Sequence, residues 1–410
     1  MSEPELNKND HRVIGRELEL FVVSDLVGKG LPMLLPKGNT LKNELDNFIT
    51  REKEALGYKF VNIPHIAKKE LYIKSGHMGR YDAMMPTMTD ENGEEFVMKA
   101  MNCPHHFEIY TSSPKSYRDL PLRIAENTTV YRNEKSGELS GLLRVKNLTQ
   151  DDTHHFIRPD QIESEIEMIF GLIEKTYKVF GFNDYKVEIS VRDPKDKEKY
   201  FGADEVWQKA EEILIKSVKK WGVKHSIVEG EAAFYGPKID FRAKDSLGRE
   251  WQLTTVQLDF NQPENFDMNY VGEDGKLHKV VVIHVAIFGS FERFMGVIIE
   301  HYEGAFPLWL SPVQVKVLPV SDKFNDYAKK VHGQLRKNFI RSELDDRQET
   351  VSYKVRDAEL RKIPFTLTVG QREEESETVA VRDKSGKVSV QKLDTFTAGL
   401  AEKIGKRENA

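Results

Sequence analysis

The spacing of apolar residues predicts three long helices in the first half of the chain. Residues 40–56 (TLKNELDNFITREKEAL) place four apolar side chains on one stripe, and Gly57 follows where a helix would end. Residues 161–180 and 204–221 repeat apolar positions at the same spacing of three and four. Because such positions share one side of a helix, each helix has a face to bury against a core.

Between residues 120 and 290 the pattern changes to the period of two, or the short apolar runs, of β-strands. The strands outnumber the helices here and follow one another closely, which favours a largely antiparallel sheet with flanking helices. The predicted strands are 120–134, 142–156, 185–192, 238–244, 249–260 and 279–288.

A domain boundary is predicted in the segment Phe306–Pro312 (FPLWLSP), where two prolines separate a helical stretch from a strand-like run. We therefore predict two domains, 1–310 and 311–410. The second alternates as a small α/β module, with strands at 313–320, near 350–355, 364–369 and 378–382, and helices at 323–338, 357–362 and 395–405.

Composition narrows the class of protein. A length of 410 residues suits two to four domains, and 39% hydrophobic residues with 31% charged residues exclude a disordered chain. The single cysteine excludes an intrachain disulfide and suits a reducing compartment. The longest apolar run, 280–288, is interrupted by His284 and is too short to span a bilayer. The polar start MSEPELNKNDHR is unlike a targeting peptide, so we expect a soluble, cytoplasmic protein with no membrane contact.

Charge adds a weak indication of a partner. The whole chain has a net charge of −5, whereas residues 313–410 carry 20 basic and 16 acidic residues. A positive module beside an acidic one fits a polyanion such as a nucleic acid, although an excess this small does not decide the matter.

Two arginines are candidates for binding a phosphate. Arg132 ends a predicted strand, a glycine-containing loop follows, and Arg144 begins the return strand. Arg293 lies one turn into a helix that starts after Gly289. Planar guanidinium groups on two sides of a nucleoside triphosphate could neutralise the reacting α-phosphate. The alternatives are an ordinary hairpin with surface ion pairs and a structural arginine on the helix.

Cys103, His154 and His284 are candidates for a metal site. A thiolate and two imidazoles suit zinc and leave a fourth position for a substrate. Their separations of 51 and 130 residues match no local zinc motif, and a buried thiol with unrelated histidines is the alternative. His105, His106 and His155 are neighbours that could serve instead.

At these segments the chain resembles the class II aminoacyl-tRNA synthetases, and the threonyl-tRNA synthetase family in particular. The similarity runs in order from about Asp10 to the C-terminus. It is carried by the strings MLLPKGNTL, KSGH (74–77), MNCP (101–104), SYRDLPLRIAE (116–126), YRNE (131–134), TQDD (149–152), AFYGPKIDF (233–241), TVQLDF (255–260), YVGEDG (270–275) and GSFERF (289–294).

The resemblance implies an α+β fold, with a class II antiparallel sheet and flanking helices followed by a C-terminal α/β anticodon-binding domain. It implies that L-threonine is activated with ATP to threonyl-adenylate and pyrophosphate, and that threonine is then transferred to the 3′ end of tRNA(Thr). It also implies one Zn²⁺ per chain, Mg²⁺ with ATP, and a homodimer formed through the motif 1 region, 40–64. The N-terminal editing modules of many relatives are not expected in this chain.

The resemblance also assigns residues, position by position. For catalysis these are Arg132, Lys238 and Arg293. For threonine they are Met101, Gln150, Asp152, Tyr235 and Gln257. For ATP they are Arg132, Glu134, Arg144, Gln252, Thr255, Ser290 and Arg293. The metal ligands are Cys103, His154 and His284, and the anticodon residues are Glu373 and Arg382.

The chemistry needs no protein nucleophile, because the threonine carboxylate itself attacks the α-phosphate. The protein has to align the reactants and neutralise charge. A zinc ion beside Asp152 would test the substrate hydroxyl, so valine should be rejected by about 10⁴–10⁵-fold. Serine lacks only a methyl group, whose loss costs about 1–3 kcal/mol of binding, so some serine should be activated in place of threonine.

The chain departs from the family pattern at four positions. His105 stands where glycine is common, Val285 follows the third metal ligand where arginine is usual, Leu148 replaces an aromatic residue, and Gln348 replaces an asparagine. Two other interpretations stay open: a prolyl or seryl enzyme of the same class, and a catalytically silent paralogue that binds tRNA. The Cys103, His154 and His284 set, with Asp152, argues against the first. The retained Arg132, Glu134 and Arg293 argue against the second.

Overall fold

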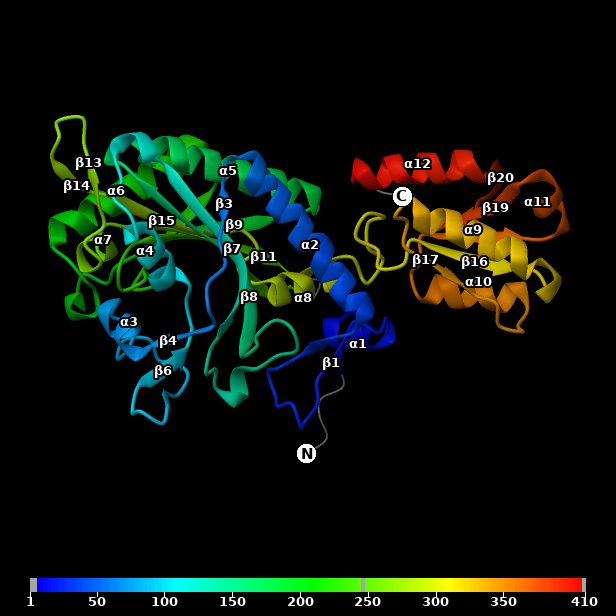
Figure 1. The fold of residues 1–410 in the computed structure, drawn as a ribbon, viewed down its shortest axis with the longest axis horizontal. Coiled ribbons are helices and arrows are strands. Elements are labelled where there is room, and N and C mark those ends of the chain that lie inside the picture. The colour runs from blue at the N-terminus through cyan, green and yellow to red at the C-terminus, as the bar shows by residue number, and fades with distance from the viewer. Residues whose placement is uncertain (1–5, 245–247, 408–410) are drawn as a thin grey trace. The chain divides into compact units, whose positions relative to one another are not determined.

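The computed structural model describes residues 6–244 and 248–407, and these form two compact units (Figure 1). One unit, called here the sheet unit, comprises residues 23–32 and 46–297. The other, called the C-terminal unit, comprises the described residues 6–22, 33–45 and 298–407. Each unit is described separately below.

The described part of the sheet unit is organised around an eight-stranded sheet of order β10-β9-β11-β12-β15-β8-β7-β3. Neighbouring strands are antiparallel except β10 with β9 and β3 with β7. This confirms the predicted sheet and the α+β class. The strands are β3 (Lys59–Phe60), β7 (Leu122–Tyr131), β8 (Asn147–Ile157), β9 (Tyr185–Val191), β10 (His225–Glu229), β11 (Lys238–Lys244), β12 (Glu250–Asp259) and β15 (Val281–Ala286).

Two small sheets complete the strands of this unit: β4 (Ile66–Lys68), β5 (Met88–Thr89) and β6 (Glu95–Met98) in one, and β13 (Asn269–Val271) with β14 (Leu277–Lys279) in the other. The helices that lie wholly or partly in this unit are α2 (Pro36–Ala55), α3 (Lys69–Lys74), α4 (Cys103–Thr111), α5 (Ile162–Val179), α6 (Asp204–Trp221), α7 (Gln262–Asn265) and α8 (Phe291–His301). α6 has the bounds that the apolar spacing predicted.

Helices α5 and α6 cover one face of the large sheet. Tyr177 of α5 hydrogen-bonds Thr254 of β12 at 2.9 Å, and its ring meets Phe241 of β11 edge-on with centroids 6.1 Å apart. Because successive side chains of a strand point to opposite faces, Thr255 faces away from these helices. The opposite face of the sheet is therefore left for a site.

An aromatic cluster joins α2 and α8 to the end of the sheet. Phe48 of α2 packs edge-on against Phe180 with centroids 5.4 Å apart, and Phe180 packs in the same way against Phe294 of α8 at 4.8 Å. Phe288 is 4.2 Å from Phe294, and all four rings are buried. Edge-to-face pairs of this kind add about 0.5–1.5 kcal/mol each beyond burial. The start of α8, which carries Arg293, is thus held by rigid packing.

The C-terminal unit contains a five-stranded sheet of order β17-β16-β18-β19-β20. Its apolar core includes Val317, Leu335 and Leu367, and it confirms the predicted α/β module. The elements are β16 (Val315–Pro319), α9 (Asn325–Lys337), β17 (Ser342–Leu344), α10 (Val351–Leu360), β18 (Phe365–Val369), α11 (Gln371–Ser376), β19 (Thr378–Asp383), β20 (Val388–Lys392) and α12 (Leu393–Gly405). At its N-terminal end it has α1 (His11–Glu17), β1 (Phe21–Val22) and β2 (Met33–Leu34).

One predicted element of this unit was wrong. The segment near 350–355 was expected to be a strand, but it forms the first half of α10, and the helix expected at 357–362 is the end of the same helix. The hydroxyl of Thr350 accepts the backbone N–H of Tyr353 and so caps the helix start. Lys354 and Ala358, four residues apart, are the buried positions. The cap stabilises a helix here, although the β-branched residues Val351 and Val355 prefer strands.

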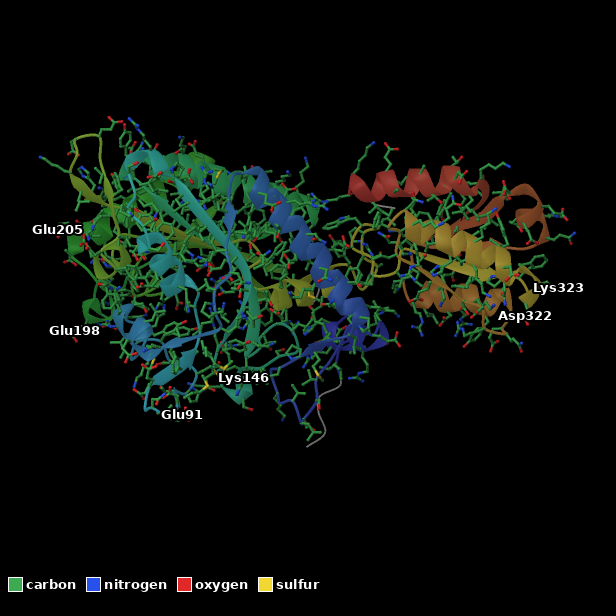
Figure 2. The ribbon with its side chains drawn as sticks, viewed as in Figure 1. Glu91, Lys146, Glu198, Glu205, Asp322 and Lys323 are labelled. Atoms are coloured by element: carbon green, nitrogen blue, oxygen red, sulfur yellow. The ribbon has the colours of Figure 1, made fainter. Side chains whose placement is uncertain are left out.

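Charged side chains such as Glu91, Glu198 and Glu205 lie on the surface, as Figure 2 shows for the labelled residues. Among the described residues, none of the helices combines the length and the apolar character needed to cross a bilayer.

Candidate active site

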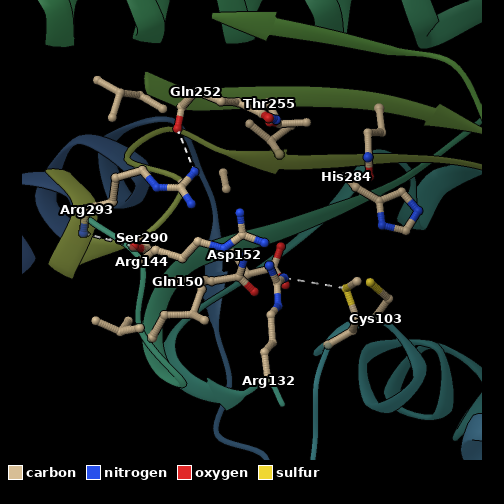
Figure 3. A pocket seen from close by; sticks show the side chains of 18 of the residues that line it. Cys103, Arg132, Arg144, Gln150, Asp152, Gln252, Thr255, His284, Ser290 and Arg293 are labelled. Atoms are coloured by element: carbon tan, nitrogen blue, oxygen red, sulfur yellow. Dashed lines mark hydrogen bonds between the residues drawn. The ribbon is translucent and has the colours of Figure 1, made fainter. Parts of the chain in front are cut away.

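A cavity of about 660 Å³ opens on the sheet face that α5 and α6 leave free. Its size lies in the range of sites for small molecules and cofactors. All the residues assigned to threonine or ATP line it, and Figure 3 labels ten of the lining side chains. They are Met101, Arg132, Glu134, Arg144, Gln150, Asp152, Tyr235, Gln252, Thr255, Gln257, Ser290 and Arg293, together with Cys103 and His284.

Strand register brings distant residues into two rows across this face. In the first row, Gln257 of β12 lies opposite His284 of β15, which lies opposite His154 of β8. In the second row, two residues further along each strand, Thr255 pairs with Ala286 and Ala286 with Asp152. Residues two apart on a strand share a face, so both rows point toward the cavity.

Cys103, His154 and His284 converge in space. Each offers a ligand atom within 4.8 Å of those of the other two, and all three residues are buried. Cys103 is the first residue of α4, which packs on β8 through Phe107, whose ring is 5.9 Å from that of His154. The structure therefore places together the three residues that the resemblance assigned to zinc.

The donor set fits a zinc ion. His154 Nε2 and His284 Nδ1 are buried without a hydrogen-bond partner among the described residues. Their other ring nitrogens are engaged: His284 Nε2 lies 2.9 Å from a carboxylate oxygen of Asp259, and His154 Nδ1 lies 2.7 Å from His106 Nδ1. Orphaned nitrogens beside a buried thiol, backed by hydrogen-bonded partners, are what a zinc site of the catalytic type requires.

Two of the histidines named as alternative metal ligands, His155 and His106, have other partners. His155 follows His154 and so points to the opposite face, where its ring nitrogens lie 3.0 Å from a carboxylate oxygen of Glu165 and 2.9 Å from the hydroxyl of Tyr58. His106 lies behind His154. Among the described residues neither belongs to the group that could hold one ion with Cys103.

Burial controls the protonation of this region. It raises the pKa of the Cys103 thiol well above its ordinary value, with the charge of Asp152 acting in the same direction. It lowers the pKa of His154 well below its ordinary value, so that imidazole is neutral, as a metal ligand must be. Burial also raises the pKa of Asp152, whose Oδ2 accepts a hydrogen bond of 3.0 Å from the Asn102 amide.

Three arginines line the cavity, together with the acidic residues Glu134, Asp152 and Glu231. Arg293 donates from Nε to the Leu143 carbonyl at 2.9 Å and from Nη1 to the Gln252 carbonyl at 3.1 Å. Burial lowers its pKa to about 10, helped by the charges of Arg132 and Arg144. The Arg293 guanidinium thus stays charged at neutral pH. Three guanidinium groups at one cavity are an arrangement suited to binding a polyanion.

Of the two arginines predicted for catalysis, Arg132 and Arg293, Arg132 is the less constrained. Its Nε is buried without a partner among the described residues, and its Nη2 is 3.9 Å from the Met101 sulfur. Its guanidinium lies over the Tyr81 ring at 5.7 Å. By contrast, Arg144 pairs with Glu134 at 2.8 Å and with Glu138 at 2.6 Å. Two assigned ATP residues, Arg144 and Glu134, therefore hold each other.

A buried carboxylate that the sequence did not predict organises the part of the cavity assigned to ATP. Asp240 is 1% exposed, and its Oδ1 accepts hydrogen bonds from Gln252 Nε2 at 2.6 Å and from Thr255 Oγ1 at 3.0 Å. Its Oδ2 accepts one from Lys238 Nζ at 2.6 Å. Lys238 does not line the cavity. The only signal was the position of Asp240 two residues after Lys238 on one strand.

Among the residues assigned to threonine, Tyr235 donates to Gln257 Oε1 at 2.7 Å, and its ring is 5.1 Å from that of His284. The sequence predicted no role for His77 of the KSGH string. This buried imidazole lies 2.8 Å from the Ser75 hydroxyl, and its Nε2 has no partner among the described residues. Burial lowers the pKa of His77 to about 3.

The two anticodon candidates lie in the C-terminal unit. Glu373 accepts the Gly370 backbone N–H at 3.0 Å at the start of α11. Arg382 of β19 donates to the Gly386 carbonyl at 3.1 Å. These contacts describe their positions only, and their assignment to the anticodon stays a prediction.

Known proteins resemble both parts of the chain. Residues 86–302 match the tRNA synthetase class II core domain (G, H, P, S and T), and residues 314–402 match the anticodon binding domain. The chain is 49% identical over 408 residues to the threonine–tRNA ligase of Phocaeicola vulgatus, covering 99% of this chain and 63% of that one. It is 50% identical over 402 residues to the ligase of Porphyromonas gingivalis, covering 97% and 61%. The chain thus spans about three fifths of the length of these curated relatives.

A solved structure agrees with the sequence matches. The crystal structure of the RNA binding domain of threonyl-tRNA synthetase from Cryptosporidium parvum Iowa II aligns with a TM-score of 0.91 at 34% identity, covering 96% of this chain and 98% of that one. The core-domain match extends over more than half of the chain. The chain therefore belongs to the class II tRNA synthetase family.

Proposed function

We propose that this chain activates L-threonine with ATP to give threonyl-adenylate and pyrophosphate, and transfers the threonyl group to the 3′ end of tRNA(Thr). The observation that carries the proposal is the cluster of Cys103, His154 and His284 beside an arginine-lined cavity. The threonine–tRNA ligases that match nearly the whole chain support it. A prolyl or seryl enzyme would have no evident use for this cluster.

Activation relies on placement and charge. Arg132 would bind the threonine carboxylate and the α-phosphate, because its guanidinium has donors to spare near Met101 and Tyr81. Arg293 would meet the nucleotide from α8. With Mg²⁺ on the phosphates, these cations would stabilise the charge that develops as the carboxylate attacks and pyrophosphate leaves. Arg144 and Glu134 pair with each other, and in the proposed complex they would instead contact the triphosphate and the adenine edge.

The metal site would select the amino acid. Cys103, His154 and His284 would hold one zinc ion, which when bound supplies a Lewis acid for the amino group and hydroxyl of threonine. Asp152 lies on the same strand face as His154 and would accept the hydroxyl proton as a hydrogen bond. Valine offers no hydroxyl and would leave both groups unmatched. Gln150, Tyr235 and Gln257 would complete the pocket.

The remaining assignments belong to the same proposal. Glu373 and Arg382 would read the anticodon from the C-terminal domain, 311–410, next to a catalytic domain, 1–310. A homodimer would form through the motif 1 region, 40–64. The single buried cysteine suits the reducing cytoplasm, where tRNA charging takes place.

The test is ATP–pyrophosphate exchange across amino acids combined with zinc analysis of the purified chain. We expect exchange that depends on threonine, weak exchange with serine, none with valine, and one zinc per chain. The variant Cys103→Ser should lose both stoichiometric zinc and threonine-dependent exchange while keeping its melting temperature. Exchange that depends on proline, or no exchange with any amino acid, would reject the proposal.

A further inference from the structure

The nitrogen of His154 that faces away from Cys103 and His284 makes an unusual contact. His154 Nδ1 lies 2.7 Å from Nδ1 of His106, and both imidazoles are fully buried. Two imidazole nitrogens can approach this closely only when one carries a hydrogen and the other offers its lone pair. The contact therefore fixes opposite roles for the two nitrogens, and the choice between them matters.

Only one of the two choices leaves His154 able to bind a metal. If His106 donates, His154 Nδ1 is the acceptor, and a neutral His154 then carries its hydrogen on Nε2, which faces the cluster. If His154 donates from Nδ1, its Nε2 lone pair is free for a cation. His154 Nε2 has no hydrogen-bond partner among the described residues, which fits the second choice.

Glu126 favours the second choice from the other side of His106. Its Oε2 lies 3.6 Å from His106 Nε2, slightly beyond hydrogen-bond distance, and both atoms are buried without another hydrogen-bond partner among the described residues. The other oxygen of Glu126 accepts the backbone N–H of Ile63 at 2.8 Å, which anchors the carboxylate. A carboxylate next to Nε2 stabilises a hydrogen on that nitrogen, and a neutral His106 then presents the lone pair of Nδ1 to His154.

The fold delivers these groups together. His106 lies three residues after Cys103 on α4, so the helix that carries the thiol also carries the supporting imidazole. Glu126 of β7 lies opposite Asp152 of β8, in the second row of the cavity face. The second imidazole of the cluster is supported more directly, because His284 Nε2 lies 2.9 Å from a carboxylate oxygen of Asp259.

We propose that His106 and Glu126 form a positioning pair that holds His154 as its Nδ1–H tautomer and so presents Nε2 to the zinc ion. Both imidazole ligands would then be backed by a carboxylate, Asp259 for His284 directly and Glu126 for His154 through His106. Supporting partners of this kind raise metal affinity by about 10–100-fold. The inference rests on the metal centre of the proposed function and concerns how tightly that centre holds its ion.

The test measures zinc affinity by competition with a chromophoric chelator, in the full chain, for wild type and four variants. His106→Phe removes the acceptor and should weaken zinc binding by about 10–100-fold. His106→Asn places an amide oxygen near the position of Nδ1 and should restore affinity to within about threefold of wild type. Glu126→Gln keeps an acceptor for Ile63 but loses the charge, and should weaken binding by about tenfold.

The matched control is His105→Phe. His105 is the neighbouring residue on α4, is 8% exposed, and has no hydrogen-bond partner on either ring nitrogen among the described residues. Its replacement should leave zinc affinity within about threefold of wild type, since it supports no ligand. Cobalt substitution gives a second readout, because the visible bands of bound Co²⁺ should shift in His106→Phe and not in His105→Phe.

The outcomes separate the two claims. Affinities of His106→Phe and Glu126→Gln equal to that of His105→Phe, in a wild type that binds one zinc, would overturn the positioning pair and leave the metal centre intact. If His106→Phe fails to fold, Glu126→Gln and His106→Asn still decide. A wild type that binds no zinc, or a Cys103→Ser variant that binds it equally well, would overturn the metal centre and the positioning pair together.

Discussion

At the scale of single residues, the cavity depends on carboxylates that are not among its lining residues. Asp259 holds His284, and Asp240 holds Gln252, Thr255 and Lys238. These acids occupy the same strand faces as the groups they orient, so the donors reach the cavity already fixed. Pre-oriented donors lose little freedom when a charged ligand arrives, which is how a site gains from electrostatic stabilisation.

Replacing Asp240 by asparagine should weaken ATP binding. The amide cannot accept from Gln252, Thr255 and Lys238 together, and Lys238 loses its counter-charge. We expect the KM for ATP to rise about tenfold, which corresponds to about 1.4 kcal/mol, with a smaller change in kcat. The measurement is ATP–pyrophosphate exchange as a function of ATP.

Asp240→Glu serves as the control, because it keeps the charge and should recover most of the affinity for ATP. A KM for ATP that is the same in wild type and Asp240→Asn would show that Asp240 has no part in holding the nucleotide side of the cavity.

The resemblance to the family predicted the cavity residues. Spacing along the sequence alone could not predict that the three candidate metal ligands lie close together in space. Cys103, His154 and His284 are 51 and 130 residues apart, and only the strand register places the two histidines opposite each other. The resemblance supplied the grouping. The supports were missed because Asp240, His106 and Glu126 look like ordinary polar residues until their partners are known.

At the scale of elements, buried ion pairs fasten the helices to the sheet. Lys53 of α2 donates to the Asp151 carbonyl at 2.5 Å and to its Oδ2 at 3.0 Å, with both side chains fully buried. The same carboxylate accepts the backbone N–H groups of Ile287 and Phe288 at 2.8 and 2.9 Å, just before α8. Through Asp151, Lys53 of α2 thus stabilises the segment between β15 and α8, the helix that carries Arg293.

Lys53→Met should destabilise the sheet unit. Removing one partner of a buried pair leaves Asp151 charged without its counter-ion, at a cost of about 3–5 kcal/mol. Chemical denaturation followed by circular dichroism measures the loss.

Lys175→Met is the matched control, because Lys175 is 58% exposed where it pairs with Glu52. An exposed pair contributes about 0–1 kcal/mol, so this variant should unfold close to wild type. Equal losses in the two variants would contradict the role of burial.

A hydrogen-bonded network of Arg123, Glu165 and His155 joins β7, α5 and β8. It should make the free energy of unfolding depend on pH in the acid range. Burial alone would raise the pKa of Glu165, but hydrogen bonds from Arg123 at 2.6 Å and from His155 at 3.0 Å outweigh it and lower that pKa to about 2. The folded state therefore binds this proton less readily than the unfolded state. The contribution of Glu165 is complete above its ordinary pKa near 4.5 and is lost as the pH falls toward 2.

The measurement is the free energy of unfolding between pH 6 and pH 3. Wild type should lose stability steadily below about pH 4.5, whereas Glu165→Gln should start less stable and show a shallower decline. Parallel curves for the two proteins would contradict the assignment.

Helix and strand bounds were predictable where one apolar period ran unbroken, as in α6, and failed where local chemistry competed with it. In α10 the Thr350 cap decided the structure, and caps are hard to weigh against β-branched residues in a short segment. The strand β20 was missed because its two outward valines, Val388 and Val390, are exposed and gave no buried pattern.

At the scale of the whole molecule, net charge says little about what the cavity attracts. The chain carries a net charge of −5, yet Arg132, Arg144 and Arg293 gather at the cavity. Guanidinium groups concentrated in one place would attract an anionic ligand there despite the negative net charge. The division into domains 1–310 and 311–410 stays a prediction, whereas the class II core and the anticodon binding domain match separate parts of the chain.

Arg382→Ala should weaken tRNA charging without affecting activation. We expect the KM for tRNA to rise about tenfold, as for loss of one base or phosphate contact, with unchanged ATP–pyrophosphate exchange. Lys403→Ala removes an equal charge from an exposed position of α12 and should have little effect. Equal losses in both variants would mean that net charge, and not recognition at Arg382, drives the interaction.

The alternation along β8 has a consequence for how the proposed site could change its amino-acid preference. Asp151 pairs with Lys53 of α2 on one side of the strand, and Asp152 lines the cavity on the other. Sliding the strand by a single residue would exchange anchor and pocket and undo both at once. An insertion or deletion within β8 would therefore disrupt both the Asp151 contacts and the cavity. A new amino-acid preference would have to arise by substitution of side chains on the cavity face.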